Sequence, residues 1–310
     1  MPSDVKAYVE MLYGGMPPPP DIVKTTLVHT LATSTHRLQI WAIRVGDPSW
    51  LEWHLTLHLP ISSAEHNFPI LLSSDGCWPH VVNTQAIDAV LEQGVCLAHF
   101  DRFQFAHDRP DGQRCGALYD HWPDSHCGAI SAWAWGLRTN VQALMQIPAL
   151  NHRKMGVIGH SRGGKAALLA GATDSHIAMT VTHNSGCAGA ASFKIRDDTA
   201  ETLMGLQATF PHWLGLACHD AQVLADLQSI DNWALLECFT GRHLCVLQAN
   251  DDLWANPQGT RYAVARLKAH WESLGLGERL HHFTRTGGHA MSALDWSRAA
   301  QSLAQMETSS

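Results

Sequence analysis

The chain has 310 residues and 45% of them are hydrophobic, so it is long enough to bury a large core in one α/β domain. Its net charge is −7 and no block of lysine or arginine occurs, which argues against a nucleic-acid partner and against an acidic membrane surface. No apolar run is long enough to span a bilayer. These features predict a single domain, residues 1–310, that meets a small or extended substrate in a pocket.

The eight cysteines form no CxxC pair in a chain much larger than a disulfide scaffold, so we expect reduced core residues. The 21 histidines include pairs such as His54 with His58, which fall on one face of a predicted strand, and His281 with His282. No cysteine or carboxylate pattern of a metal site accompanies these pairs. We therefore predict no metal site and expect no cofactor.

The N-terminal residues 1–24 contain the run Pro17 to Pro20, which predicts an extended arm laid over the surface. The first residues lack the charged and then apolar layout of a signal peptide, so no export is expected for the chain as written. A signal that had been removed would leave the same appearance. Localisation and oligomeric state are therefore left open.

Two β-rich runs between His36 and Pro60 flank a Gly-Asp-Pro-Ser turn and predict an antiparallel hairpin at a sheet edge. Short apolar runs typical of buried strands follow at residues 68–74, 94–100, 155–158 and 177–182, and two further strands are predicted at 243–248 and 280–284. Helices are predicted between them, at residues 83–93, 129–147, 257–274 and 291–305, with a polar loop at 107–126 and a loop-and-helix insertion at 196–221. The alternation predicts an α/β fold: a mostly parallel, doubly wound sheet in a three-layer αβα sandwich with antiparallel N-terminal edge strands.

The stretch KMGVIGHSRGGKAALLAGATD, from Lys154 to Asp174, has the pattern of a nucleophile elbow. A short strand leads through a GxSxG turn into a helix, and glycines flank Ser161 because a Cβ in so tight a turn would collide with its neighbours. The helix directs its free N–H groups and positive dipole end at the turn, so the backbone N–H of Arg162 is a predicted oxyanion donor. The alternative is that Ser161 only caps the helix.

Three features follow three successive strands in the order Ser161, then Asp251 and Asp252, then His289. This is the chain order of the Ser-Asp-His triad in the α/β-hydrolase fold, and ligands of open α/β sheets lie at these strand ends. His289 is the predicted base, and it needs a carboxylate to fix its tautomer and stabilise its imidazolium. The spacing alone leaves Asp251 and Asp252 as alternatives for that carboxylate.

Five segments between residues 128 and 305 resemble the bacterial glucuronoyl esterases of carbohydrate esterase family 15. They occur in the same order as in that family and read GHSRGGKAALLAGATD, THNSGCAGAA, AETLMGLQATFPHWL, ANDDLWANP and GGHAMSALDW. The resemblance implies a serine esterase that cleaves esters of (4-O-methyl-)glucuronic acid, as in lignin-carbohydrate linkages, through an acyl-enzyme.

The resemblance also implies residue roles. The family serine falls on Ser161 and its base on His289. The family acid is often a glutamate before the SG that follows the next strand, where this chain has Asn184. Since an amide supplies no negative charge, the acid is predicted to be the aspartate of the DDLW segment that the family pattern aligns, Asp252.

Four further positions match substrate-contacting residues of the family. Arg162 resembles the arginine that assists the oxyanion hole, and Lys165 the lysine that hydrogen-bonds the sugar hydroxyls. Glu201 and Trp213 fall where the family has a glutamate and a tryptophan that hold the uronate ring. The alternatives are a solvated helix lysine for Lys165 and a packing role for Trp213.

Two other functions remain as alternatives at this stage. One is a general carboxylesterase or acetyl esterase that acts on small esters with the same triad. The other is a non-catalytic, carbohydrate-binding member of the fold, because fold does not fix function. In each case the expected partner is a small-molecule or carbohydrate ester substrate, with no nucleic acid and no membrane.

Overall fold

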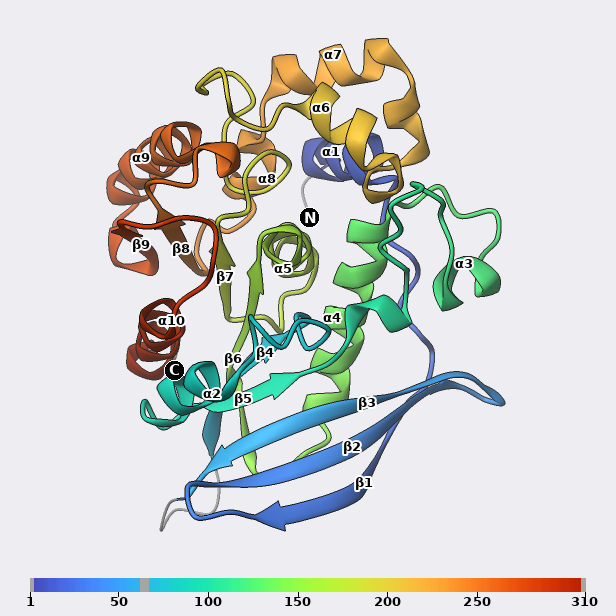
Figure 1. Ribbon diagram of the computed structural model, residues 1–310, viewed down its shortest axis with the longest axis vertical. Helices are drawn as coiled ribbons and strands as arrows, with labels where there is room; N and C mark the ends of the chain where they lie inside the picture. Colours follow the sequence, from blue (N-terminus) through green and yellow to red (C-terminus); the bar gives the residue numbers. More distant parts are fainter. Residues whose placement is uncertain (1–2, 62–66, 308–310) are drawn as a thin grey trace.

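The computed structural model describes residues 3–61 and 67–307, whose strands join in one nine-stranded sheet (Figure 1). The strand order is β1-β2-β3-β5-β4-β6-β7-β8-β9. The strands are β1 (Val23–Ala32), β2 (His36–Gly46), β3 (Ser49–Pro60), β4 (Phe68–Ser73), β5 (Cys96–His99), β6 (Leu150–His160), β7 (Met179–His183), β8 (His243–Ala249) and β9 (Leu280–Arg285). Pairing is parallel from β5 through β4 and β6 to β9 and antiparallel from β1 to β3 and between β3 and β5. The predicted mostly parallel sheet with antiparallel N-terminal strands is therefore confirmed.

The helices follow the strands in the alternating order that a doubly wound sheet requires. They are α1 (Ser3–Tyr13), α2 (Thr84–Leu91), α3 (Ala117–His121), α4 (Ala129–Leu144), α5 (Arg162–Thr173), α6 (Leu203–Thr209), α7 (Ala221–Ile230), α8 (Trp233–Glu237), α9 (Pro257–Ser273) and α10 (Ala293–Gln305). None of the helices in the described part of the chain is both long and apolar enough to cross a membrane.

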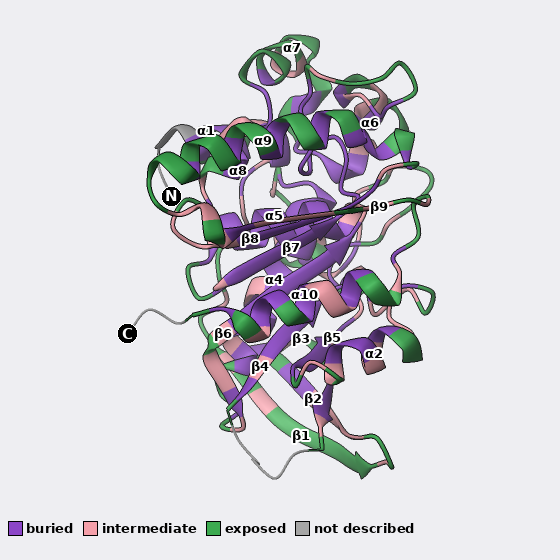
Figure 2. Cartoon of the chain, turned by 90° about the vertical axis from the view of Figure 1, so that its left-hand side faces the viewer, coloured by how far each residue is buried: buried purple, intermediate pink, exposed green. Residues whose placement is uncertain are grey.

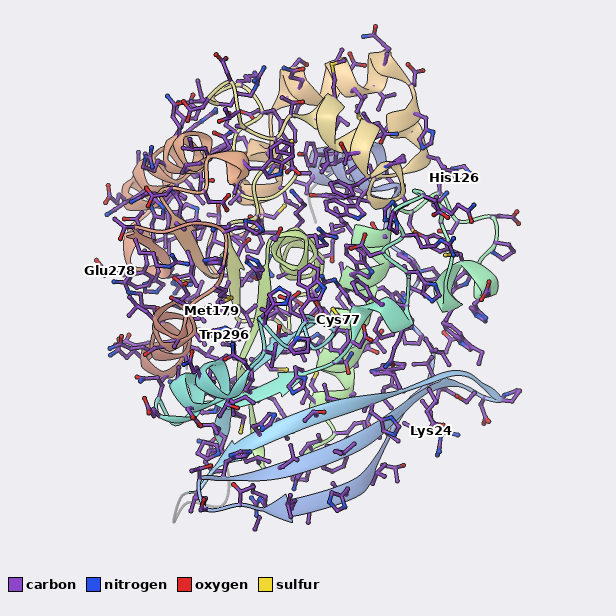
Figure 3. All side chains as sticks on the ribbon, viewed as in Figure 1. Lys24, Cys77, His126, Met179, Glu278 and Trp296 are labelled. Carbon is purple, nitrogen blue, oxygen red and sulfur yellow. The ribbon has the colours of Figure 1, made fainter. Side chains whose placement is uncertain are left out.

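Helices cover both faces of the sheet, and each face has its own buried core. Residues of α1, α4, α5, α8 and α9 pack on one face, and residues of α2 and α10 pack on the other. Met179 and Trp296, which are labelled in Figure 3, both belong to the second core. Figure 2 shows the central strands β6, β7 and β8 as buried and the edge strand β1 as exposed. Burial on both faces explains the unbroken apolar runs of the parallel strands.

The prediction of an extended arm over residues 1–24 is wrong for Ser3–Tyr13, which form α1. Tyr8, Leu12 and Tyr13 of this helix are at most 1% exposed, because its apolar positions recur at helical spacing and pack into the core. The proline run that suggested an arm comes after the helix and does not interrupt it.

The hairpin predicted between His36 and Pro60 is confirmed as β2 and β3, but it does not form the edge of the sheet. β1 pairs with β2 on the outside, with a register shift between Leu27 and His29. Most of β1 is exposed, so its sequence carries little of the alternation by which half-buried strands are recognised.

Candidate active site

Ser161 occupies the tight turn between β6 and α5. Its backbone lies at φ 54° and ψ −119°, a sparsely populated conformation of the kind found at nucleophile elbows. A Cβ on Gly159 would strike the backbone of Gly163, and a Cβ on Gly163 would strike the side chain of Asp75. The predicted need for glycine at both positions is confirmed, although a carboxylate and not backbone limits the second. The Ser161 side chain makes no capping hydrogen bond to α5, so the helix-cap alternative is wrong.

A buried ion pair supports the elbow from below. Asp75, at the end of β4, accepts a hydrogen bond from the backbone N–H of His160 at 2.8 Å. Its other oxygen pairs with Arg102, and both side chains are 0% exposed. The backbone of His160, the residue before Ser161, is therefore held by the Asp75 carboxylate, which lies just after a neighbouring strand of the same sheet.

His289 and Asp252 meet at the ends of β8 and β9. The Nδ1 atom of His289 lies 2.5 Å from Oδ2 of Asp252, whose side chain is 7% exposed. The neighbouring Asp251 instead accepts a hydrogen bond from the backbone N–H of Gly287 at 2.6 Å. Of the two aspartates left open by the spacing, Asp252 contacts the histidine and Asp251 holds its loop.

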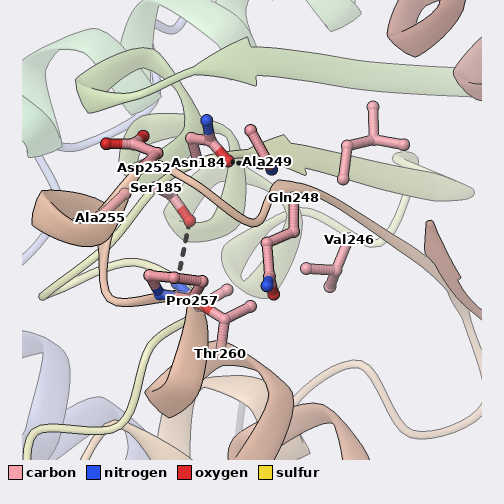
Figure 4. Close-up of a pocket in the computed structure, with 11 residues that line it drawn as sticks. Asn184, Ser185, Val246, Gln248, Ala249, Asp252, Ala255, Pro257 and Thr260 are labelled. Atoms are coloured by element: carbon pink, nitrogen blue, oxygen red, sulfur yellow. Dashed lines mark hydrogen bonds between the residues drawn. The ribbon is translucent and has the colours of Figure 1, made fainter. Parts of the chain in front are cut away.

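Asn184 stands at the position where the resemblance described above implies an acid in many family members. Its Oδ1 accepts from the backbone N–H of Ala249 at 2.8 Å, and its Nδ2 donates to the carbonyl of His289 at 3.4 Å. Figure 4 shows Asn184 and Asp252 around a small pocket behind the site, together with Ser185 and Ala249. Asn184 therefore connects the end of β8 to the loop of His289, and Asp252 is the carboxylate that contacts the histidine.

One open cleft collects the predicted site residues. Ser161 and His289 line it together with the four predicted contact residues and with Asn184, Ser185, Gly186, Phe210, Trp254 and Ala255. About 420 Å³ of space lies between its walls when the open mouth is counted. The structure thus brings the elbow, the base and the predicted sugar contacts to one place at the carboxyl ends of the parallel strands.

Arg162 is held at the cleft by Asp108, a residue of the loop at 107–126 that the sequence did not single out. The two side chains form an ion pair, and Asp108 also accepts from His212 Nε2 at 3.0 Å and from Trp213 Nε1 at 2.8 Å. Burial acts to raise the pKa of Asp108, but the bond from His212 and the charge of Arg162 lower it well below its usual range. The Arg162 guanidinium also lies 4.4 Å from the ring of Trp213.

Trp213 is 2% exposed, and its indole N–H is used by Asp108. Its ring stacks on Phe210 with centroids 3.9 Å apart. The structure therefore places Trp213 in the wall of the cleft, where it supports Arg162 and Asp108. These contacts agree with the alternative that Trp213 has a packing role.

Lys165 and Glu201 form a buried ion pair in the cleft, with Nζ and Oε2 separated by 2.8 Å. Lys165 is 2% exposed and also donates to the carbonyls of Ser185 and Cys187. The alternative of a solvated helix lysine is therefore wrong. Both side chains line the cleft, but the three N–H donors of Lys165 already have acceptors within the protein.

Trp254 also lines the cleft and was missed by the sequence reasoning. Its side chain is 53% exposed, and its carbonyl accepts from the backbone N–H of Glu201 at 2.9 Å. A half-exposed indole at a cleft suits stacking on the apolar face of a sugar ring. The sequence feature that could have identified Trp254 is its position two residues after the predicted acid Asp252.

Metal binding has no support in the described residues. No group of three or more His, Cys, Asp or Glu side chains there is arranged to hold an ion. His58 does not pair with His54 but lies between His36 and His99, with ring nitrogens 3.1 and 3.2 Å apart.

A family model described as "Glucuronyl esterase, fungi" matches residues 58–275. The chain belongs to the glucuronyl esterase family. The resemblance inferred from its motifs is thereby confirmed at the level of the family.

Two curated relatives are similar over part of the chain. "Carbohydrate esterase MZ0003", from an unknown prokaryotic organism, is 32% identical over 54% of this chain and 42% of its own length. The "4-O-methyl-glucuronoyl methylesterase" of Hypocrea jecorina (strain QM6a) is 30% identical over 67% of this chain and 47% of its own length. The matched part thus spans somewhat under half of each of these relatives.

A solved structure shares the fold. The family 15 glucuronoyl esterase from Caldicellulosiruptor kristjansonii superposes with a TM-score of 0.80 and 24% identity, over 97% of this chain and 83% of that chain. The α/β-hydrolase fold predicted from the sequence is confirmed.

Proposed function

We propose that this glucuronyl esterase family member is a serine esterase that hydrolyses carboxylic esters of glucuronic acid or its 4-O-methyl ether. The observation that carries the proposal is one cleft lined by the Ser161 elbow, by the Lys165–Glu201 pair and by His289, whose Nδ1 contacts Asp252. A relative that is 30% identical is named a 4-O-methyl-glucuronoyl methylesterase, which supports the same substrate class.

The chemistry would proceed through an acyl-enzyme. His289 takes the proton of Ser161 while the serine Oγ attacks the ester carbonyl, and Asp252 stabilises the imidazolium. The imidazolium then gives its proton to the leaving alcohol, and a water molecule repeats the sequence on the acyl-enzyme. The alcohol leaves in the first step and the acid in the second, so the uronate acyl group is bound covalently to Ser161 between the two steps.

The oxyanion would be stabilised at the start of α5. The backbone N–H of Ser161 already donates to the carbonyl of His183 at 2.8 Å, so the donors must come from the following residues. The backbone N–H of Arg162 lies in the first turn of the helix, where N–H groups have no intrahelical partner. The Arg162 guanidinium, fixed by Asp108, adds a positive charge on the same side.

The proposal is tested by following hydrolysis of benzyl glucuronate and of a small acetyl ester by the wild type and by Ser161→Ala. We expect the wild type to prefer the uronate ester, and the serine variant to lose about four or more orders of magnitude in turnover. Turnover that survives Ser161→Ala would refute the mechanism. A preference for the acetyl ester that Lys165→Met leaves unchanged would instead favour the general carboxylesterase.

A further inference from the structure

The loop that carries His289, residues 286–290, contains two adjacent glycines and therefore needs ties from outside to hold one conformation. One side chain, Arg285 at the end of β9, contacts both ends of this loop. Its Nη1 donates to the carbonyl of Thr286 at 3.0 Å, and its Nη2 donates to the carbonyl of Ala290. The arginine side chain itself is 16% exposed, whereas the two carbonyls that it contacts belong to exposed residues.

Asp295 anchors the same guanidinium to a rigid element. The Nε of Arg285 donates to its two oxygens at 3.1 and 2.9 Å. Asp295 is 2% exposed and belongs to the capping box that starts α10, where it accepts from the backbone N–H and the hydroxyl of Ser292. The position of the arginine is therefore set by the start of a helix and not by the loop itself.

Two buried histidines connect the arginine to the ring of His289. Nε2 of His183 lies 3.4 Å from Nη2 of Arg285 and 3.5 Å from Oδ2 of Asp295. On the other side of the ring, Nδ1 of His183 shares a hydrogen bond with Nδ1 of His160 across 2.9 Å. The ring of His160 in turn lies 4.6 Å from the ring of His289, measured between centroids.

Burial lowers the pKa of both rings. Neighbouring positive groups lower the pKa of His160 further, whereas the Asp295 carboxylate opposes the effect of burial on the pKa of His183. The two Nδ1 atoms face each other across 2.9 Å, so only one of them carries a proton in this hydrogen bond. Burial and the nearby positive groups therefore favour an uncharged His160 imidazole beside His289.

We propose that Arg285 is a positioning residue of the active site, which holds His289 through both ends of its loop and through the His183–His160 pair. The inference rests on the proposed function, since it assigns His289 as the base. Misplacement of a catalytic group by about 1 Å costs about a hundredfold in rate, so a tie of this kind affects turnover without touching substrate.

The test uses the full chain with Arg285→Lys, which keeps the charge and loses the fork of donors. We expect kcat on benzyl glucuronate to fall by about 10- to 100-fold, with KM changed less than about threefold. Labelling of Ser161 by a fluorophosphonate probe should slow by a similar factor, because it needs the same base and no uronate contacts. In Arg285→Ala, added guanidinium should restore part of the labelling rate.

The matched control is Arg242→Lys. Arg242 also uses its guanidinium to bind backbone carbonyls, those of Gly171, Asp174 and Cys238, but lies before β8 at the opposite end of the strands. It should lose stability to a similar degree and keep the wild-type labelling rate. Melting temperatures of both variants show whether they are compared as folded proteins.

Wild-type labelling rates in folded Arg285→Lys would overturn the proposal, whatever the substrate proves to be. An equal loss in Arg242→Lys would overturn it too, because the effect would then be general destabilisation. A wild type that is labelled rapidly and does not hydrolyse uronate esters would instead overturn the proposed function and leave the positioning role to be judged by the labelling rates alone.

Discussion

Replacing Asp108 tests whether the Arg162 guanidinium must be held in place for catalysis. In Asp108→Asn the side chain keeps its shape and one acceptor oxygen but loses its negative charge. Three donors face that group, from Arg162, His212 and Trp213. The arginine loses most, because only its bond is one between full charges.

The magnitude follows from the change in bond type. A hydrogen bond to a charged partner contributes about 1.5–3 kcal/mol and a neutral one about 0.5–1.5 kcal/mol, so Asn weakens the hold on Arg162 by about 1–1.5 kcal/mol. Since 1.4 kcal/mol is a factor of about ten in population, kcat should fall about tenfold. Asp108→Ala removes every acceptor and should approach the loss of about a hundredfold seen when one oxyanion donor is removed.

The assay is steady-state hydrolysis of benzyl glucuronate, with the folded fraction of each variant checked by thermal unfolding. KM should change little, because the oxyanion exists only in the transition state. Asp111→Asn is the matched control, since Asp111 pairs with Arg109 on the same loop with both side chains over 40% exposed. Unchanged kcat in Asp108→Ala would refute the reasoning, and a higher kcat would show that Asp108 competes with the oxyanion for Arg162.

Three further predictions concern the acid, the ion pair in the cleft and a buried histidine. Asp252→Asn should lower kcat by about four orders of magnitude, whereas Asp251→Asn, which loses only its bond to the loop, should cost far less in the same assay. Lys165→Met leaves the Glu201 charge buried without its partner and should lower the free energy of unfolding by about 3–5 kcal/mol, measured with urea; a smaller loss in Glu201→Gln would fit, and none in Lys165→Met would not. Burial and then its histidine neighbours lower the pKa of His58 to about 3, so below about pH 6.5 the unfolded chain binds a proton that the folded chain does not. As the pH falls from about 6.5 to about 3, His58 should therefore lower the free energy of unfolding by about 1.4 kcal/mol per pH unit. In urea titrations, the free energy of unfolding of His58→Phe should depend less steeply on pH than that of the wild type.

The parts of the fold that the sequence predicted are those with a strong local signal. The elbow at Ser161 depends on short-range sterics, and its two glycines are required by contacts that the GxSxG pattern already encodes. The parallel strands that are buried on both faces appear in the sequence as apolar runs, so β7 and β8 were located within two residues, whereas β6 was recognised only in its buried second half. The exposed strand β1 lacked such a signal. The helix α1 was missed because the proline run that follows it favoured the prediction of an extended arm.

The partners of charged groups in the site could not be predicted from the sequence, because they depend on which loops the sheet brings together. Arg162 and Asp108 are 54 positions apart, and the long polar loop around Asp108 offered several acidic residues with equal claim. Arg285 was unremarked because an arginine before a glycine-rich loop is ordinary, and only the contacts to Thr286, Ala290 and Asp295 distinguish it.

The departure at Asn184 shows how such long-range contacts decide a role. The resemblance implies a glutamate acid at this position in many family members, but this chain has an asparagine, whose amide spans from Ala249 to the carbonyl of His289. A glutamate there would bring a second negative charge near Asp252, and two carboxylates that share a site raise one another's pKa. With Asn184 in this chain, Asp252 is the carboxylate that contacts Nδ1 of His289 and the one proposed as the acid. If this reasoning holds, Asn184→Glu should restore activity to Asp252→Asn in benzyl glucuronate hydrolysis, and a double variant as inactive as Asp252→Asn alone would contradict it.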